Sequence, residues 1–211
     1  WITDNWGMDA IISPANGTEK ALRNAIQLLA KEKAQRKTIY IHTGWRNIQG
    51  KWAYLYHGGA IGADNISVEL EGALTRYSLP EASQDYKEAA MTSFKTLDIA
   101  PLEVTLPLLA LTYLTPLNEF FRQAECEPAF TLWLVGKSGS RKSTIASIFL
   151  SHFGSFSETS LPFSFRDTQN SLEKVGFLLK DMLMVVDDYH PSGTRQEKQR
   201  MEATAQALMR Q

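Results

Sequence analysis

The feature that most limits the fold of this chain is a short run of glycine, serine and basic residues between two apolar segments. The run is GKSGSRKST, residues 136–144. It matches the spacing G-x-x-x-x-G-K-[ST] at every fixed position except one, where Arg141 replaces the second glycine. Strand-forming apolar residues precede it at 129–136, and residues 143–153 follow with helical spacing. We therefore predict a strand, a phosphate-binding loop and a helix in that order.

Each part of such a loop has its own chemical task. Successive backbone N–H groups form an anion-binding nest, and the N-terminus of the following helix adds positive potential. Lys142 would contact the β and γ phosphates, and the Ser143 hydroxyl would bind the Mg²⁺ ion that bridges them. The other predicted nucleotide-binding residues belong to the same loop: Gly136, Lys137, Ser138, Gly139, Ser140, Arg141 and Thr144.

Arg141 is the departure that bears on this prediction. Glycine at its position lets the backbone pass close to the phosphates without a side chain. Either the loop accepts arginine in an ordinary helical conformation with the side chain pointing away, or the site is degraded. A simple turn between strand and helix is the competing interpretation of the segment, and the elements around it argue against that.

A second apolar run, MLMVVDD at residues 182–188, ends in two carboxylates. In a parallel sheet this end would lie beside the phosphate loop. Asp187 could then reach Mg²⁺ through water, and Asp188 could act as the catalytic base facing the attacking water. A solvated strand end or a helix cap is the alternative for this pair, and His190 just beyond it is expected to be a loop residue.

The segments around the loop alternate between predicted strands and helices. Residues 161–165 predict a short strand and residues 171–180 a helix, so residues 129–211 predict a parallel α/β core. Residues 81–128 are expected to form a helical bridge. Its helices are predicted at 83–97 and 102–122, with Pro107 and Pro116 interrupting the second.

Residues 1–80 predict a small α/β accessory domain. An amphipathic helix is expected over 21–33, with Thr18 placed to cap it. Runs of β-branched and aromatic residues then predict antiparallel strands joined by a tight turn at Gln49–Gly50. One more extended piece is expected within residues 68–80.

Aromatic residues recur along these strands and allow two interpretations. They could form a stacking platform for single-stranded nucleic acid, or they could pack in the core, which is the more usual role at alternating strand positions. The residues are Trp45, Trp52, Tyr54 and Tyr56.

Charge and cysteine content limit the setting in which the chain works. A formal net charge of -1 over 211 residues gives no whole-surface attraction to nucleic acid. Cys126 is the single cysteine and cannot form an internal disulfide, which favours the cytoplasm. The longest apolar stretch falls short of the ~20 residues that cross a bilayer, so no membrane association is expected.

Several separated motifs, in order, resemble the ATPase domains of replication proteins, often primase-helicases, carried by phages, plasmids and integrative elements. The resemblance covers nearly the whole chain. The segments that carry it are AIQLL at 25–29, IHTGWRNIQGKWAYLYHGGAIGA at 41–63, LTRYSLP at 74–80, WLVGKSGSRKST at 133–144 and MVVDDYHP at 184–191.

The resemblance implies a P-loop NTPase core of the AAA-like (ASCE) type, in which hydrolysis of Mg²⁺-bound ATP drives a ring-forming DNA helicase. It implies Lys142 and Asp188 as catalytic residues, Ser143 and Asp187 as the metal site, and DNA and further copies of the chain as partners of the full-length protein. A polar sensor and an arginine finger cannot be placed before Gln211. We therefore expect the core to be C-terminally truncated and the isolated fragment to hydrolyse ATP weakly or not at all.

Two other functions stay open. A non-hydrolysing nucleotide-dependent switch or DNA-binding scaffold would result if Arg141 and the short Asp188 side chain abolish turnover while binding survives. A small-molecule kinase is the weaker alternative, because the sequence contains no arginine-rich lid. ATP rather than GTP follows from the resemblance alone, since the loop contacts only phosphates.

Overall fold

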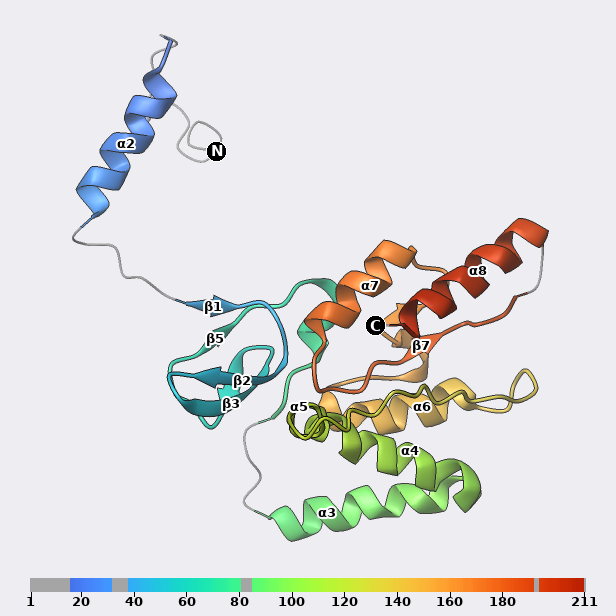
Figure 1. Cartoon of the computed structure of the whole chain (residues 1–211). Helices are drawn as coiled ribbons and strands as arrows, with labels where there is room; N and C mark the ends of the chain where they lie inside the picture. Colours follow the sequence, from blue (N-terminus) through green and yellow to red (C-terminus); the bar gives the residue numbers. More distant parts are fainter. Residues whose placement is uncertain (1–15, 32–37, 81–84, 192–193, 211) are drawn as a thin grey trace. The chain divides into compact units, whose positions relative to one another are not determined.

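The structure is a computed structural model, and it describes residues 16–31, 38–80, 85–191 and 194–210 (Figure 1). The chain divides into two compact units, Trp1–Lys37 and Thr38–Gln211. Among the described residues, no helix is long and apolar enough to cross a membrane.

The first unit contains the amphipathic helix α2, Thr18–Ala30. The helix begins three residues earlier than predicted. Its N-cap is Gly17, which takes the left-handed conformation with φ 90°, so the prediction of Thr18 as the cap is wrong. The apolar stripe that the sequence predicts is present but uncovered within the described residues, where Ile26 is 50% and Leu29 78% exposed.

The second unit starts with two small sheets. Strand β1, Ile39–Tyr40, pairs in parallel with β5, Ser67–Val68. Strands β2, Gly44–Ile48, β3, Lys51–Tyr56, and β4, Gly59–Ile61, form an antiparallel sheet in that order.

The predicted hairpin turn is confirmed. Gln49 has φ 53° and Gly50 has φ 85°, as the two central residues of the tight turn between β2 and β3. The expected extended piece is realised only in β5, because residues Gly72–Arg76 form a 3₁₀ helix, η2. A positive φ of 57° at Gly72 opens that turn.

The strand aromatics mostly pack inward. Tyr54 is buried, and its hydroxyl donates to the backbone carbonyl of Asp181 at 2.5 Å. The Trp45 ring packs edge-on against Tyr54, and its Nε1 donates to the carbonyl of Pro116 at 2.7 Å. Trp52 is exposed, whereas Trp45 and Tyr56 are half-buried. Core packing is therefore the role of Trp45 and Tyr54.

Helices follow as predicted. They are α3, Tyr86–Phe94, with the 3₁₀ helix η3, Lys95–Ile99; then α4, Leu102–Leu114, η4, Thr115–Leu117, and α5, Asn118–Gln123. Pro116 lies in η4, where the predicted interruption occurs. The predicted interruption at Pro107 is wrong, because Pro107 lies inside α4, which continues to Leu114.

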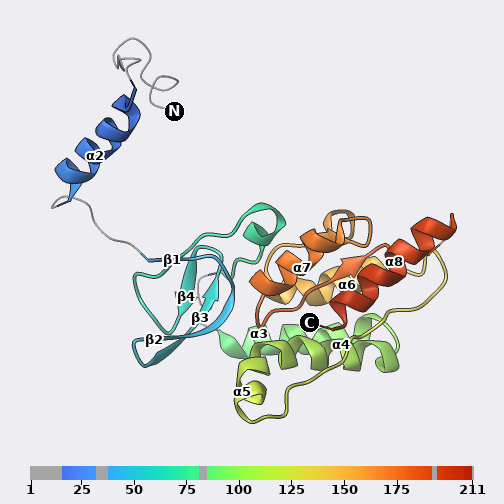
Figure 2. The same ribbon diagram turned by 45° about the horizontal axis from the view of Figure 1, so that its top comes forward.

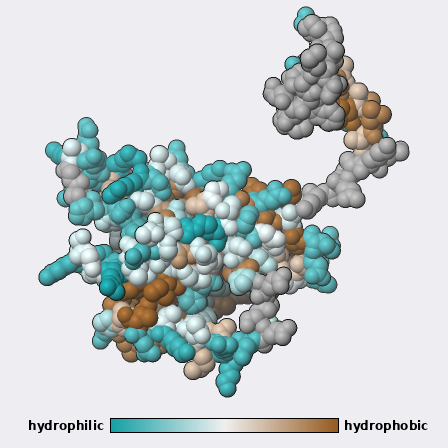
Figure 3. All heavy atoms as spheres, turned by 180° about the vertical axis from the view of Figure 1, so that it is seen from behind, coloured by the Kyte–Doolittle hydropathy of each residue, from teal (hydrophilic) through white to brown (hydrophobic). Residues whose placement is uncertain are grey.

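The surface of these helices carries exposed apolar side chains. Figure 3, the view from behind, shows an apolar patch in the lower part of the molecule, where α3 and α4 lie. The exposed apolar residues of these two helices include Met91, Phe94, Leu102 and Leu106.

The elements after residue 141 are helix α6, Lys142–Leu150, the 3₁₀ helices η5, Ser151–Phe153, and η6, Glu158–Ser160, strand β6, Phe163–Ser164, helix α7, Gln169–Leu178, strand β7, Val186–Asp187, and helix α8, Arg195–Leu208. Strands β6 and β7 are parallel, with Phe163 opposite Val186. Both strands are shorter than predicted. The chain thus has a mixed α/β structure with small parallel and antiparallel sheets.

The prediction of a strand over residues 129–136 is wrong for the described structure, where this segment is irregular. Its side chains alternate in exposure: Val135 is 91% exposed, whereas Leu132 and Leu134 pack against the core. The sequence pattern predicts an extended segment correctly, but a strand also needs a neighbour to share its backbone hydrogen bonds. Among the residues that the structure describes, β7 pairs with β6 alone.

One core of buried side chains joins residues 38–80 to the α6–α7 region. The second view of the ribbon shows residues 38–80 next to α7 (Figure 2). The Tyr77 ring is fully buried and its hydroxyl donates to the Leu183 carbonyl at 3.2 Å. Thr43 donates from Oγ1 to the Lys180 carbonyl at 2.8 Å. The predicted divisions at residues 80 and 128 stay predictions, while the hairpin region and the phosphate loop belong to one compact unit.

Candidate phosphate-binding site

Arg141 takes the left-handed conformation, with φ 59° and ψ 30°, as the N-cap of α6. Of the two alternatives for Arg141, the ordinary helical conformation is therefore not the one that the structure shows. This is the conformation that glycine reaches without penalty and that costs another residue about 1–2 kcal/mol. The Arg141 side chain is exposed. The loop thus keeps a glycine-like backbone despite the arginine, at the cost of local strain.

The Lys142 side chain folds back onto the start of the phosphate loop. Its Nζ donates to the carbonyl oxygens of Gly136 and Lys137, both at 3.0 Å, and lies 3.5 Å from Ser140 Oγ. A Cβ at Gly136 would come within 2.9 Å of Ser140 Oγ, so this glycine lets the loop fold tightly. The ammonium group is held by weak neutral acceptors, which a phosphate would outmatch as a partner.

Ser143 and Asp187 meet across 44 residues of sequence. The Ser143 Oγ donates to Asp187 Oδ2 at 2.7 Å, with both residues partly buried. Ser143 lies in the first turn of α6 and Asp187 at the end of β7. The two residues predicted to share a metal ion are therefore adjacent.

Asp188 lies beyond β7 in the left-handed region, with φ 61°. Its Oδ2 accepts a hydrogen bond from Ser164 Oγ at 3.4 Å and is 3.6 Å from Arg166 Nε. Strained backbone of this kind is concentrated at functional sites and must be held by its surroundings. The predicted base is thus next to the loop region but already engaged by two side chains.

Sequence reasoning missed Ser164 and Arg166. Ser164 is the last residue of β6 and Arg166 lies two residues beyond it, and the carboxyl ends of β6 and β7 lie at the same edge of their sheet. Parallel strands bring the residues after their carboxyl ends together. A signal was therefore available, since residues 161–165 were predicted as a strand and Arg166 comes directly after them.

The other loop residues have separate placements. Lys137, Ser138, Gly139 and Ser140 are exposed. Gly139 has φ 78°, the second left-handed position of the loop. Thr144 turns toward Glu158, to which its Oγ1 donates. Thr144 is thus partnered away from the Ser143–Asp187 pair.

A cavity of about 780 Å³ adjoins the loop. One wall comes from the start of α4 and includes Pro101 and Val104, and another comes from α6 and includes Ile145. The lining is apolar apart from Glu103 and the loop itself. It offers few polar groups that would distinguish adenine from guanine.

The metal prediction is compatible with the donors present. No group of three or more histidine, cysteine, aspartate or glutamate side chains that could hold a metal occurs in the described parts of the chain. Mg²⁺ at nucleotide sites needs only one or two protein oxygens, since phosphates and water supply the others. The Ser143 hydroxyl and the Asp187 carboxylate fit this requirement.

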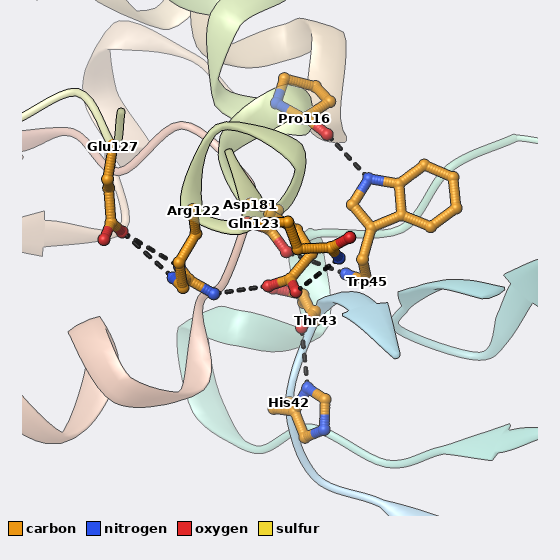
Figure 4. A network of polar contacts seen from close by, with 9 residues as sticks. His42, Thr43, Trp45, Pro116, Arg122, Gln123, Glu127 and Asp181 are labelled. Atoms are coloured by element: carbon orange, nitrogen blue, oxygen red, sulfur yellow. Dashed lines mark hydrogen bonds and ion pairs between the residues drawn. The ribbon is translucent and has the colours of Figure 1, made fainter. Parts of the chain in front are cut away.

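A second polar centre lies away from the loop and ties β2 to α5 (Figure 4). Burial raises the pKa of the Asp181 carboxyl group, while a hydrogen bond from the Trp45 backbone N–H at 2.9 Å and the charge of Arg122 oppose that rise. Arg122 is itself paired with Glu119 at 2.5 Å and Glu127 at 3.2 Å. This centre joins elements of the fold and does not extend the phosphate site.

Comparison with known proteins adds no relative. No family model matches the chain, and no curated protein and no solved structure matches it.

Proposed function

We propose that this chain binds ATP together with Mg²⁺ at the loop of residues 136–144. The observation that carries the proposal is the 2.7 Å hydrogen bond between Ser143 and Asp187. This bond joins a serine in the first turn of a helix to an aspartate at the end of a strand, next to a lysine that folds back onto its own loop. A simple turn between strand and helix does not require this combination. Phosphate-binding loops need that combination, because the hydroxyl and the carboxylate share the metal ion.

The residues of the loop would divide the work as follows. The backbone N–H groups at the start of α6 would receive the phosphates, favoured by the helix N-terminus. Lys142 would leave the carbonyl oxygens of Gly136 and Lys137 and pair with the β and γ phosphates. Ser143 and Asp187 would hold Mg²⁺, which when bound neutralises charge on the phosphate oxygens.

Hydrolysis would depend on Asp188. A carboxylate that orients the attacking water has to be free to accept its proton. In the described arrangement the same oxygen faces Ser164 and Arg166. We therefore propose that hydrolysis requires Asp188 to separate from these two side chains.

The wider proposal rests on the sequence motifs. We infer an AAA-like P-loop core acting as the ATP-hydrolysing motor of a DNA helicase or primase-helicase in mobile-element replication, in the cytoplasm, with DNA and a ring of identical copies as partners. The support for this part is the resemblance of the ordered motifs in residues 25–191 to such proteins.

A second candidate is a nucleotide-dependent switch or DNA-binding scaffold that does not hydrolyse ATP. The strained Arg141 and the engaged Asp188 favour it. A measurement of ATP turnover by the full-length protein, with and without DNA, separates the two. DNA-stimulated phosphate release supports the motor, and tight binding without release supports the switch.

The first experiment is equilibrium binding of ATP and GTP in the presence of Mg²⁺. Lys142→Ala should weaken binding roughly 10- to 100-fold, as expected for loss of a hydrogen bond between charged groups. Lys174→Ala, which removes an exposed lysine from α7, is the matched control and should bind like the native chain. Equal affinity of the native chain and Lys142→Ala would contradict the proposal.

A further inference from the structure

Arg166 is placed at the acidic end of β7 by backbone contacts. The Phe165 N–H donates to the Asp187 carbonyl at 2.9 Å, which extends the β6–β7 ladder by one step. Arg166 is the next residue, and its Nε is 3.6 Å from Asp188 Oδ2. The guanidinium group therefore lies at the same sheet edge as the Ser143–Asp187 pair.

The pairing of Arg166 with Asp188 is weak. The two side chains are 79% and 49% exposed, and exposed ion pairs contribute little because water and salt screen them. Only Nε faces the carboxylate at this distance, although a guanidinium can offer two parallel donors to one anion. A triphosphate carries more charge than a carboxylate and suits that fork, so it would compete for Arg166.

The turn at residues 164–167, which follows β6, does not need the guanidinium group of Arg166 to keep its conformation. The Ser164 N–H donates to Asp167 Oδ2 at 3.0 Å, and the Asp167 N–H donates to the Ser164 carbonyl at 2.9 Å. The Arg166 N–H donates to Ser164 Oγ at 3.1 Å through the backbone. These bonds hold the turn whatever side chain occupies position 166, so a substitution there is expected to leave the fold intact.

We propose that Arg166 is a nucleotide-binding residue that exchanges Asp188 for the terminal phosphate of bound ATP. The exchange places a positive charge on the γ-phosphate from within the same chain. It also frees Asp188 to face water, so that occupancy of the site by ATP, but not by ADP, releases the base. This inference rests on the proposed function and adds the residue that distinguishes the two nucleotides.

The test is a comparison of ATP and ADP affinities, measured by calorimetry with Mg²⁺ for the native chain and three variants. Arg166→Gln should lower ATP affinity about tenfold and leave ADP affinity nearly unchanged. Asp188→Asn should raise ATP affinity up to about fivefold, because Arg166 no longer has a competing partner. In the double variant this gain should disappear.

The double variant separates the proposal from simple repulsion between Asp188 and the phosphates. Relief of repulsion would raise ATP affinity by the same factor with or without Arg166, and that result would overturn the proposal. Arg46→Gln, which removes an exposed arginine from β2, is the matched control for loss of one positive charge and should change neither affinity.

Two failures are distinguishable. If the native chain binds ATP and ADP but Arg166→Gln weakens both equally or neither, the exchange is wrong and the phosphate site stands. If the native chain and Lys142→Ala both fail to bind any nucleotide, the proposed function is wrong and the exchange fails with it. Circular dichroism of each variant confirms that the compared proteins are folded.

Discussion

Replacing Arg141 by glycine should stabilise the chain. Arg141 has φ 59°, where a residue with a Cβ pays about 1–2 kcal/mol. Glycine removes that penalty but loses more backbone freedom on folding, which costs about 0.5–1 kcal/mol. The difference of the two ranges spans about 0–1.5 kcal/mol, so the expected net gain for Arg141→Gly in the free energy of unfolding is centred on about 0.75 kcal/mol.

Arg141→Ala is the control that isolates the backbone effect. It removes the same charge and the same long side chain but keeps the Cβ, so the left-handed penalty stays. The glycine variant should therefore melt above the alanine variant. For a protein of this size, 1 kcal/mol corresponds to roughly 2–4 °C in Tm.

The assay is thermal unfolding of both variants and the native chain in one buffer, without nucleotide. A second measurement by urea unfolding gives the free energies directly, provided that the m-values agree. If Arg141→Gly is no more stable than Arg141→Ala, the left-handed strain at this position is absent in solution. The account of how the loop accommodates arginine would then be refuted.

Three further predictions follow from the described contacts. Asp187→Asn should make ATP affinity nearly independent of Mg²⁺. The ratio of the ATP affinities with Mg²⁺ and with EDTA should fall roughly tenfold or more, which titrations under the two conditions would detect. Gly44→Ala should lower the free energy of unfolding in urea by about 2–5 kcal/mol, because Gly44 has φ 84° and an added Cβ would lie 2.5 Å from Asp181 Oδ2. Gly50→Ala is the control: Gly50 has φ 85° but open space around it, so the cost should be only about 1–2 kcal/mol. Burial raises the pKa of Asp181 above its ordinary 3.8, so the folded chain binds this proton more tightly than the unfolded chain does. The stability that comes from this proton is therefore lost as pH rises from about 4 through the folded pKa. Asp181→Asn should lack this loss, and unfolding midpoints at successive pH values should show a stability difference that widens in favour of Asp181→Asn across that range.

Local chemistry in the sequence was enough to place several elements. The turn at Gln49–Gly50 needs two residues that tolerate positive φ, and the interruption at Pro116 follows from a residue without an N–H. The helix that starts at Lys142 and the positions of strands β6 and β7 also follow from apolar periodicity, whereas their pairing with each other does not, since β7 was expected beside residues 129–136. For the candidate site, the same reasoning named Ser143 and Asp187, which the fold brings together.

Only the tertiary structure decided the features that depend on distant partners. Whether residues 129–136 become a strand is set by a neighbouring backbone, which no local pattern encodes. The conformation of Arg141 is imposed by loop closure, and the engagement of Asp188 by Ser164 arises from contact across 24 residues. Residue types determine which groups can bind a phosphate, but packing between separate segments determines which of them are free to do so.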